Sequence, residues 1–346
     1  MTHHPGAHPT RRPEHPGRGL LLLLAGLAVA CGGKVPQFPR DGELRLDQVQ
    51  LLGTHNSYHL APEGVTLPEL AYSHAPLTTQ LAQYGVRQFE LDVNRIDPAD
   101  PFEVFHIYTF DEETTCRRFT DCLSELKAWS DVNPLHVTLV VLLEPKDLFD
   151  AATVEDYFQQ LEEEILSVWP RDRILAPADV QGSAASLAEA IGARGWPTLG
   201  EVRQKVLFVL LDGDEHREAY THGGQDLDGR LLFASGGAGF PYGGFVLMDD
   251  PLGDPAAIPA AAEAGFLIRT RADTPGVEAP AGDTTRRDAA LASGAHCIST
   301  DHPAPVEGVD YVVELPGGGV GRCNPVTAPA DCTPADIEQP YHLPGD

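Results

Sequence analysis

Short, unbroken apolar runs recur along the chain, and they restrict the folds it can adopt more than any other feature. Two of them, "VTLVVLL" from Val137 to Leu143 and "VLFVLL" from Val206 to Leu211, contain no polar residue except one Thr. Continuous apolar strands are typical of parallel sheets that are covered on both faces. We expect eight strands: Val49–Gly53, Gln88–Val93, Glu103–Ile107, Val137–Leu143, Lys205–Leu211, Phe245–Met248, Phe266–Thr270 and His296–Thr300.

Helix-like segments separate several of these runs. Val154–Trp169 has apolar residues at roughly helical spacing with carboxylates between them, and Ser186–Gly195 and Ala256–Gly265 end in Gly, a common helix stop. Eight strands with intervening crossovers predict a single α/β domain folded as a closed (β/α)8 barrel. A doubly wound open sheet is the alternative, and the strand count could differ by one.

The first thirty residues have the pattern of an export signal. Three Arg residues precede an apolar run from Leu20 to Ala30, which is too short to span a bilayer and ends in an A-x-A pattern before Cys31. We expect a signal peptide over 1–30, an N-terminal segment over 31–47, and the barrel with a C-terminal extension over 48–346. The pattern also approximates a lipoprotein signal that would lipidate Cys31. An exported protein is therefore expected, either an envelope lipoprotein or a secreted one.

Export would permit disulfides. Besides Cys31, the chain has two close pairs, Cys116 with Cys122 and Cys323 with Cys332, each able to close a small loop. Cys297 is the odd thiol, which we expect to be buried in a strand. The chain has no C-x-x-C pair, so a zinc ribbon is a poor interpretation.

The formal charge of −27 restricts the partners. Such a field repels nucleic acid and anionic membrane surfaces, so we expect no nucleic-acid partner, and binding to a membrane would need a tether or a metal. Much of the acidity is explained by solubility alone. We expect a monomer.

Polar residues follow or end nearly every predicted strand, where a barrel places its catalytic groups. Glu90 and Asp92 are two apart in "FELDV", so both point to one side of a strand among apolar neighbours. Glu144 ends the most apolar strand, and Asn56 follows the first one. Three carboxylates and an amide oxygen form an all-oxygen site, which suits Ca²⁺ better than zinc or copper. The sequence therefore predicts a calcium site.

Two histidines flank these ligands in the predicted barrel. His55 follows the first strand and His106 ends the third. Beside a hard cation, such a pair indicates a general acid and a general base acting on a phosphoryl group. His59, His74 and His136 have no such support, and we interpret them as structural.

At this point the ordered motifs resemble those of the bacterial calcium-dependent, phosphoinositide-specific phospholipases C. The resemblance rests on "GTHNSYH", "ELDV", "VFHIYTFD" and "LLEPKD", and continues in "GWPTLGEVR", "FLIRTRAD", "LASGAHCISTD" and "GRCNP". It runs from about Gln48 to Cys332, nearly the whole chain after the predicted signal. "ELDV" alone is weak, whereas the ordered set is strong.

The resemblance implies a TIM-like barrel that cleaves between diacylglycerol and the phosphorylated inositol of a membrane phospholipid. It also implies that calcium is bound by Asn56, Glu90, Asp92 and Glu144. His55 and His106 take the places of the family's two histidines.

A mechanism follows from this chemistry. The inositol 2-hydroxyl must be deprotonated by His55 or Glu144, with calcium lowering its pKa, and His106 would protonate the departing diacylglycerol oxygen. Lys146, Arg269 and Arg271 are candidate partners for phosphate groups, with ordinary surface pairs as the alternative.

Two other functions remain open. Glycerophosphodiester phosphodiesterases share the barrel and the His, E-x-D and His elements, but typically follow the first His with Arg, whereas Asn56 stands here. A non-catalytic, calcium-dependent lipid-binding lipoprotein is the other alternative, although both histidines and all four proposed calcium ligands are present. The sequence does not define the inositol head group.

Overall fold

The computed structural model of the chain describes residues 38–64, 66–211 and 214–338. The predicted signal over 1–30 and the predicted anchor at Cys31 lie outside these residues. Among the described residues, no helix has both the length and the apolar character needed to cross a membrane.

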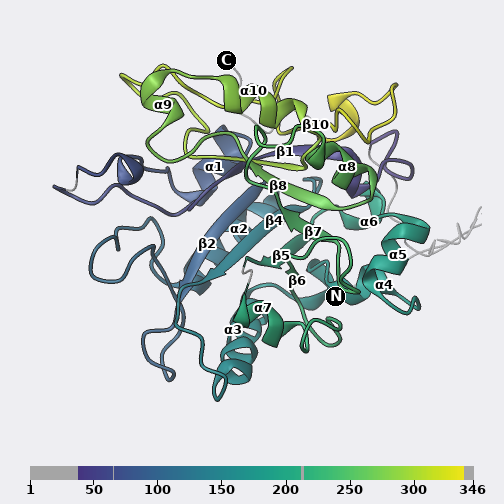
Figure 1. The fold of residues 1–346 in the computed structure, drawn as a ribbon, viewed down its shortest axis with the longest axis horizontal. Helices are drawn as coiled ribbons and strands as arrows, with labels where there is room; N and C mark the ends of the chain where they lie inside the picture. Colours follow the sequence, from purple (N-terminus) through teal and green to yellow (C-terminus); the bar gives the residue numbers. More distant parts are fainter. Residues whose placement is uncertain (1–37, 65, 212–213, 339–346) are drawn as a thin grey trace, which may run out of the picture. The chain divides into compact units, whose positions relative to one another are not determined.

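Ten strands form one sheet, seen at the centre of Figure 1. They are β1 (Val49–Thr54), β2 (Gln88–Asn94), β3 (Glu103–Val104), β4 (Leu139–Pro145), β5 (Val206–Leu210), β6 (Phe233–Ala234), β7 (Phe245–Leu247), β8 (Leu267–Arg271), β9 (Cys297–Thr300) and β10 (Gly321–Cys323).

Ten α-helices and four short 3₁₀-helices accompany the described strands. The α-helices are α1 (Leu77–Gln83), α2 (Phe119–Val132), α3 (Val154–Val168), α4 (Pro177–Gln181), α5 (Leu187–Arg194), α6 (Leu199–Val202), α7 (Glu215–Tyr220), α8 (Ala257–Glu263), α9 (Glu278–Ala281) and α10 (Thr285–Ala292). The 3₁₀-helices are η1 (Leu46–Gln48), η2 (Pro68–Leu70), η3 (Arg171–Arg173) and η4 (Pro334–Asp336).

Eight of the strands form a nearly closed parallel barrel, which confirms the predicted fold class. Their order is β6-β5-β4-β2-β1-β9-β8-β7, every neighbouring pair is parallel, and a parallel bridge between Ser235 and Phe245 joins the two ends of the path. The apolar runs behave as expected, since every residue of β5 and all of Leu139–Leu143 in β4 are buried. The open doubly wound alternative is wrong.

One predicted barrel strand is wrong. Glu103–Ile107 was expected to be the third parallel strand, but only Glu103–Val104 is extended, and it pairs antiparallel with the end of β2. His106 therefore lies in a loop rather than at a strand end. The barrel strand that was not predicted is β6. It has only two residues and lies between glycines at 229 and 236, so its sequence pattern is too short to recognise.

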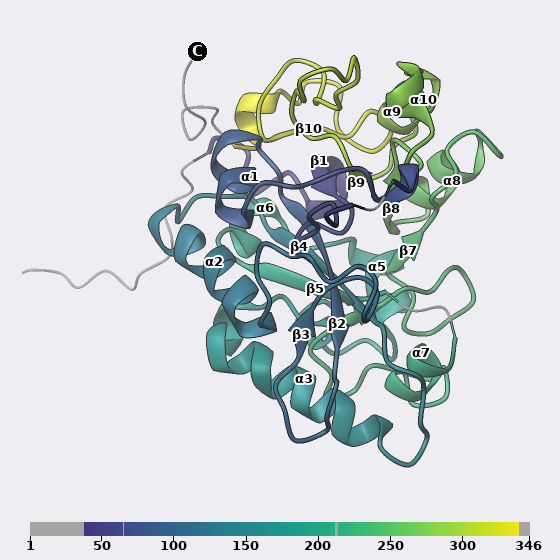
Figure 2. The ribbon, with the colours of Figure 1, turned by 90° about the vertical axis from the view of Figure 1, so that its left-hand side faces the viewer.

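Amphipathic helices cover the outside of the barrel. In α3 the buried side chains Tyr157, Phe158, Leu161 and Ile165 fall on one face, with acidic residues between them, as the predicted helix over Val154–Trp169 required. Helix α2 packs against both α1 and α3, and these helices lie on one side of the strands in Figure 2. The two short Gly-ended segments also form helices, α5 and α8.

The segment after β9 returns to the amino end of the barrel, the end where the parallel strands begin. Strand β10 pairs antiparallel with Val49–Leu51 of β1, as Figure 2 shows near the top of the view. Both predicted disulfides form, Cys116 with Cys122 and Cys323 with Cys332, and Cys297 is a buried free thiol in β9. These three cysteine predictions are confirmed.

Candidate active site

The stretch after β1 is both a turn and part of a candidate site. Asn56 is buried and has a left-handed backbone with φ of 40°, which Asn tolerates better than most residues. The next residue, Ser57, ties the turn to β2: its N–H donates to the Glu90 carbonyl at 2.9 Å and its Oγ accepts from the Glu90 N–H at 2.8 Å. The turn thus places Asn56 beside the carboxylates of β2.

Three carboxylates converge at the carboxyl end of the barrel, the end where the parallel strands finish. Asp92 on β2 is in register with Glu144 on β4, and Glu90 lies two residues before Asp92 on the same side. Each of the three offers an oxygen within 4.8 Å of the others. The structure thus brings together the three carboxylates that the sequence analysis singled out.

Several polar atoms in this cluster have no hydrogen-bond partner among the described residues. They include Oδ1 of Asn56 and both carboxylate oxygens of Asp92, all buried. Burial raises the pKa of Glu90 to about 7, although Arg269 opposes the shift, and burial together with Glu144 raises the pKa of Asp92. Buried oxygens without donors are costly unless a cation takes them up, and hard oxygens are the ligands that Ca²⁺ prefers. The four residues therefore fit a calcium ion.

Two cations touch the cluster. Lys146 Nζ donates to Glu144 Oε1 at 2.8 Å and forms an ion pair with Asp92 Oδ2 at 2.9 Å. Arg269 is buried and donates to Glu90 Oε2 at 2.5 Å and to Asp249 Oδ1 at 2.7 Å. The carboxylates outweigh the effect of burial and raise the pKa of both cations.

His55 is oriented by a buried carboxylate. Its Nδ1 donates to Asp301 Oδ1 at 2.9 Å, so its Nε2 faces the cluster, 3.8 Å from Glu90 Oε1. Burial and then Arg271 lower the pKa of His55 to about 3, although Asp301 opposes them. His55 is thus a neutral imidazole at pH 7 with its Nε2 lone pair toward the carboxylates. Arg271 Nη2 lies 3.4 Å from Asp301 Oδ2.

His106 lies in the loop after β3. Its Nδ1 donates to Asp111 Oδ2 at 2.8 Å, and its side chain is 24 % exposed. Burial lowers the pKa of His106, Asp111 opposes this, and the charge of Lys146 adds to it. The charge of Lys146, which donates to Glu144, thus acts on His106.

Sequence reasoning missed the partners that orient the two histidines. Asp301 was given no role, although its position directly after β9 was a usable signal. Asp111 carries no such signal, because its position depends on a turn within the loop. His59 was interpreted as purely structural, yet its Nε2 lies 3.1 Å from both oxygens of Asp111.

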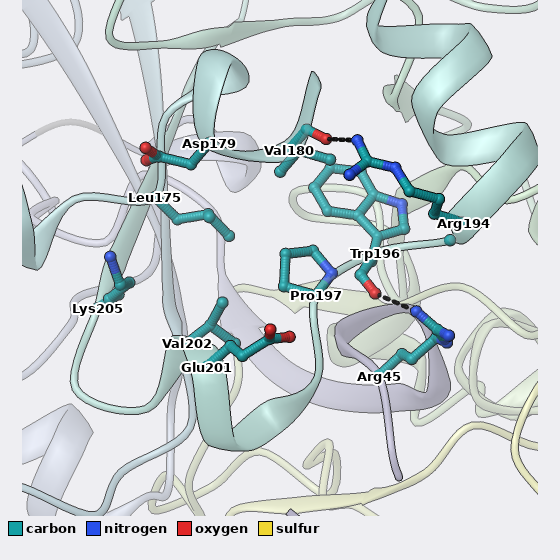
Figure 3. Close-up of a pocket in the computed structure, with 11 residues that line it drawn as sticks. Arg45, Leu175, Asp179, Val180, Arg194, Trp196, Pro197, Glu201, Val202 and Lys205 are labelled. Atoms are coloured by element: carbon teal, nitrogen blue, oxygen red, sulfur yellow. Dashed lines mark hydrogen bonds between the residues drawn. The ribbon is translucent and has the colours of Figure 1, made fainter. Parts of the chain in front are cut away.

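A separate cavity of about 360 Å³ lies near the amino ends of the strands (Figure 3). It is lined by Leu175, Trp196 and Lys205 among others, and Arg45 and Arg194 close parts of it by donating to the Trp196 and Val180 carbonyls. None of the candidate site residues lines this cavity, so it is not part of the site at the carboxyl end.

The geometry agrees with comparisons to known proteins. Residues 44–100 and 97–325 match the family described as phosphoinositide phospholipase C, Ca²⁺-dependent. No curated protein matches the chain.

Solved structures show the same fold. An apo crystal form of a calcium-dependent phosphoinositol-specific phospholipase C from a Pseudomonas species is 18 % identical, with a TM-score of 0.56 over 83 % of this chain and 99 % of that one. A Ca²⁺-dependent phosphatidylinositol-specific phospholipase C from Streptomyces antibioticus is 19 % identical, with a TM-score of 0.57 over 75 % and 95 %. The family match spans well over half of the sequence, and the chain belongs to the Ca²⁺-dependent phosphoinositide phospholipase C family.

Proposed function

We propose that this enzyme cleaves phosphatidylinositol-type lipids with two histidines that face each other across the carboxylate cluster. The observation that carries the assignment is symmetrical. His55 and His106 each donate from Nδ1 to a buried Asp, which leaves Nε2 of each ring available, and Nε2 of His55 lies 3.8 Å from Glu90 Oε1. This arrangement suits proton removal from one oxygen of a phosphodiester and proton delivery to another.

Asn56, Glu90, Asp92 and Glu144 would hold the calcium ion. Calcium bound there would lower the pKa of the inositol 2-hydroxyl and stabilise the charge that develops on the phosphate. The unpartnered oxygens of Asn56 and Asp92 support this ligand set.

His55 is the better of the two candidates for the general base. Its Nε2 carries the lone pair, because Nδ1 is committed to Asp301. Glu144, the alternative, has its Oε1 occupied by a hydrogen bond of 2.8 Å from the Lys146 ammonium. His55 would take the proton of the 2-hydroxyl as that oxygen attacks phosphorus.

His106 would act as the general acid. Its Nε2 would give a proton to the diacylglycerol oxygen as the bond from that oxygen to phosphorus breaks. Arg271 and Lys146 would contact phosphate oxygens. Arg269 is bound to two carboxylates, so its contribution would be to hold Glu90.

The test is the product and its dependence on the leaving group. Phosphorus NMR during turnover with phosphatidylinositol and calcium should show a cyclic inositol phosphodiester first. His106→Ala should lower the rate about 10²–10⁴-fold on the lipid and much less on an inositol phosphate ester with a phenolate leaving group. His55→Ala should lower the rate on both substrates. The exposed His222, paired with Asp226 on the surface, offers the control His222→Ala.

The outcomes separate the alternatives. An acyclic phosphate from the earliest time points, without a cyclic species, would favour a phosphodiesterase that activates water. Calcium-dependent vesicle binding without any turnover would favour the lipid-binding lipoprotein. Full activity in excess chelator would contradict the calcium site.

The membrane contact would lie beside His106. Ile107, Tyr108 and Phe110 are 42 %, 58 % and 50 % exposed on the loop that carries it, and Leu148, just after β4, is 96 % exposed. Apolar side chains at the rim would enter the lipid interface above the site. Tyr108→Ser with Phe110→Ser should weaken binding to phosphatidylinositol vesicles without reducing turnover of a soluble substrate.

We also propose an exported monomer anchored through a lipidated Cys31. The sequence pattern before Cys31 supports export and lipidation. Cys31→Ser should then release the protein from membranes or block its processing, whereas a mature wild-type protein with an unmodified Cys31 would indicate secretion. Light scattering on the purified protein checks the monomer.

A further inference from the structure

One buried carboxylate serves two histidines beside the proposed site. Asp111 has a fully buried side chain, and its oxygens contact both His106 Nδ1 at 2.8 Å and His59 Nε2 at 3.1 Å. His59 is also fully buried. The first of these rings reaches the reacting atoms in the proposed mechanism, and the second does not.

A tight turn brings Asp111 back to His106. Ile107 and Asp111 exchange backbone hydrogen bonds of 2.9 and 2.8 Å, and Thr109 between them has a φ of 63°. A left-handed backbone is unfavourable for a β-branched residue, so the surrounding contacts must hold the turn. The turn points Tyr108 and Phe110 to solvent and keeps Asp111 inside.

The rest of the loop is fastened to the segment that follows β1. Thr115 N–H donates to the Tyr58 carbonyl at 2.8 Å and Leu60 N–H to the Glu113 carbonyl at 3.2 Å. The Cys116–Cys122 disulfide then joins the loop to α2. Asp111 therefore has little freedom to leave His106.

His59 holds the Asp111 carboxylate in addition to His106. Its Nδ1 lies 3.0 Å from the Tyr72 carbonyl and its Nε2 faces both oxygens of Asp111. A carbonyl and a carboxylate can only accept, and His59 contacts one of each through its two ring nitrogens. Asp111 also only accepts, so the proton between it and His106 sits on His106 Nδ1.

We propose that Asp111, held by His59, is the positioning residue that keeps Nδ1 of His106 protonated and directs Nε2 at the departing oxygen. This inference rests on the proposed role of His106 as general acid. When Nε2 gives up its proton to the diacylglycerol oxygen, the ring retains the proton on Nδ1, and the Asp111 charge stabilises the imidazolium that precedes the transfer. His59 closes the motif "GTHNSYH" that begins the site and links it to the loop of the second histidine.

The test compares two Asp→Asn variants on two substrates. Asp111→Asn should reduce kcat about 10²-fold or more on phosphatidylinositol, within the range expected for general-acid catalysis, and less than about 10-fold on the phenolate-type ester. Asp301→Asn is the matched control, because it orients the proposed base and should reduce kcat on both substrates by similar factors. His59→Gln should repeat the Asp111→Asn pattern with a smaller loss.

The outcomes distinguish the inference from the function on which it rests. If His106→Ala shows no preference for the better leaving group, the acid assignment itself fails. If His106→Ala shows it and a folded Asp111→Asn loses both substrates equally, or neither, Asp111 does not act through His106.

A measurement on the wild-type enzyme covers the case in which Asp111→Asn does not fold. Nitrogen-15 NMR at neutral pH, with His106 assigned by comparison with His106→Gln, should find a proton on Nδ1 of His106. An unprotonated Nδ1 would overturn the proposal.

Discussion

The two ends of the barrel hold their buried charges in opposite ways. At the amino end, Arg87 donates to Glu338 at 2.5 and 3.2 Å and to two backbone carbonyls, and Glu338 also accepts from the Val137 N–H. Arg203 likewise binds Asp41 through two nitrogens and caps two more carbonyls. In both pairs each charge has a partner of opposite sign and further hydrogen bonds to the backbone.

At the carboxyl end, buried charged and polar side chains lack some of their hydrogen-bond partners. Both oxygens of Asp92, Oδ1 of Asn56 and the Nε atoms of Arg269 and Arg271 lack hydrogen-bond partners among the described residues. A partner of opposite charge offsets the desolvation cost of a buried charge. A buried polar group without a partner is stabilised when a ligand supplies one. The difference indicates that the amino end serves stability and the carboxyl end serves binding and catalysis.

The largest expected effect comes from breaking the amino end. Glu338→Gln leaves Arg87 buried without its counter-ion, so the free energy of unfolding should fall by about 3–5 kcal/mol. Urea unfolding at pH 7 measures it, and the folded protein should keep its catalytic rate. A loss near zero would mean that the two ends do not differ in this way.

Acid should weaken the amino end through two buried histidines. The ring nitrogens of His136 contact the Ser130 hydroxyl and the Val137 carbonyl. Those of His296 contact the Asp47 carbonyl and the Ile268 N–H. Both patterns suit a neutral ring, and burial lowers the pKa of each histidine from 6.5 to about 4.

The unfolded chain therefore binds these protons first as the pH falls. The stability they contribute is complete above pH 6.5 and is lost toward pH 4, with a slope of up to about 1.4 kcal/mol per pH unit for each histidine. Urea unfolding of His296→Gln across this range should show a smaller slope than the wild type. Equal slopes would place the acid sensitivity elsewhere.

Glu90 at the carboxyl end has the opposite sign. Burial raises the pKa of Glu90 from 4.5 to about 7, so in chelator the folded state holds this proton more tightly, and its contribution to stability falls as the pH rises through that window. Glu90 and the two amino-end histidines therefore oppose each other between pH 4.5 and 6.5, and only a comparison of variants separates them.

The smallest expected effect is that of Asp92→Asn, the same acid-to-amide change at the carboxyl end. Asp92 repels Glu144, and Lys146 would keep Glu144 as its partner after the change. The replacement should therefore alter the free energy of unfolding in chelator by no more than about 1 kcal/mol. The thermal shift produced by added calcium should be lost. A loss as large as that of Glu338→Gln would remove the distinction between the ends.

Local patterns in the sequence predicted the barrel and its carboxylates. Strands buried on both faces show as unbroken apolar runs, so most strand positions were correct within a few residues. The Glu90 and Asp92 pair followed from the two-residue period of a strand, and Glu144 followed from its place at the end of β4. The cysteine pairs followed from closeness along the chain.

Features that depend on distant contacts were not predictable. Glu103–Ile107 has a strand composition, but the chain turns at 107–111 and leaves only two residues paired. Asp301 and Asp111 reach their histidines across 246 and 5 residues, through a barrel closure and a left-handed Thr. Neither sequence separation indicates a His–Asp pair, because the fold decides which Asp reaches each histidine.

The pairing of Arg87 with Glu338 has a consequence for the order of events during synthesis. The partners are 251 residues apart, and Arg203 also needs the carbonyl of Ile337. While a ribosome adds about 5–20 residues per second, β1 to β9 emerge before the Arg87 guanidinium can be neutralised by Glu338. A nascent chain therefore carries an uncompensated charge at the base of its unfinished barrel. The C-terminal segment, made last, then closes the amino end of the barrel. We expect chains truncated before β10 to remain open and sensitive to proteases.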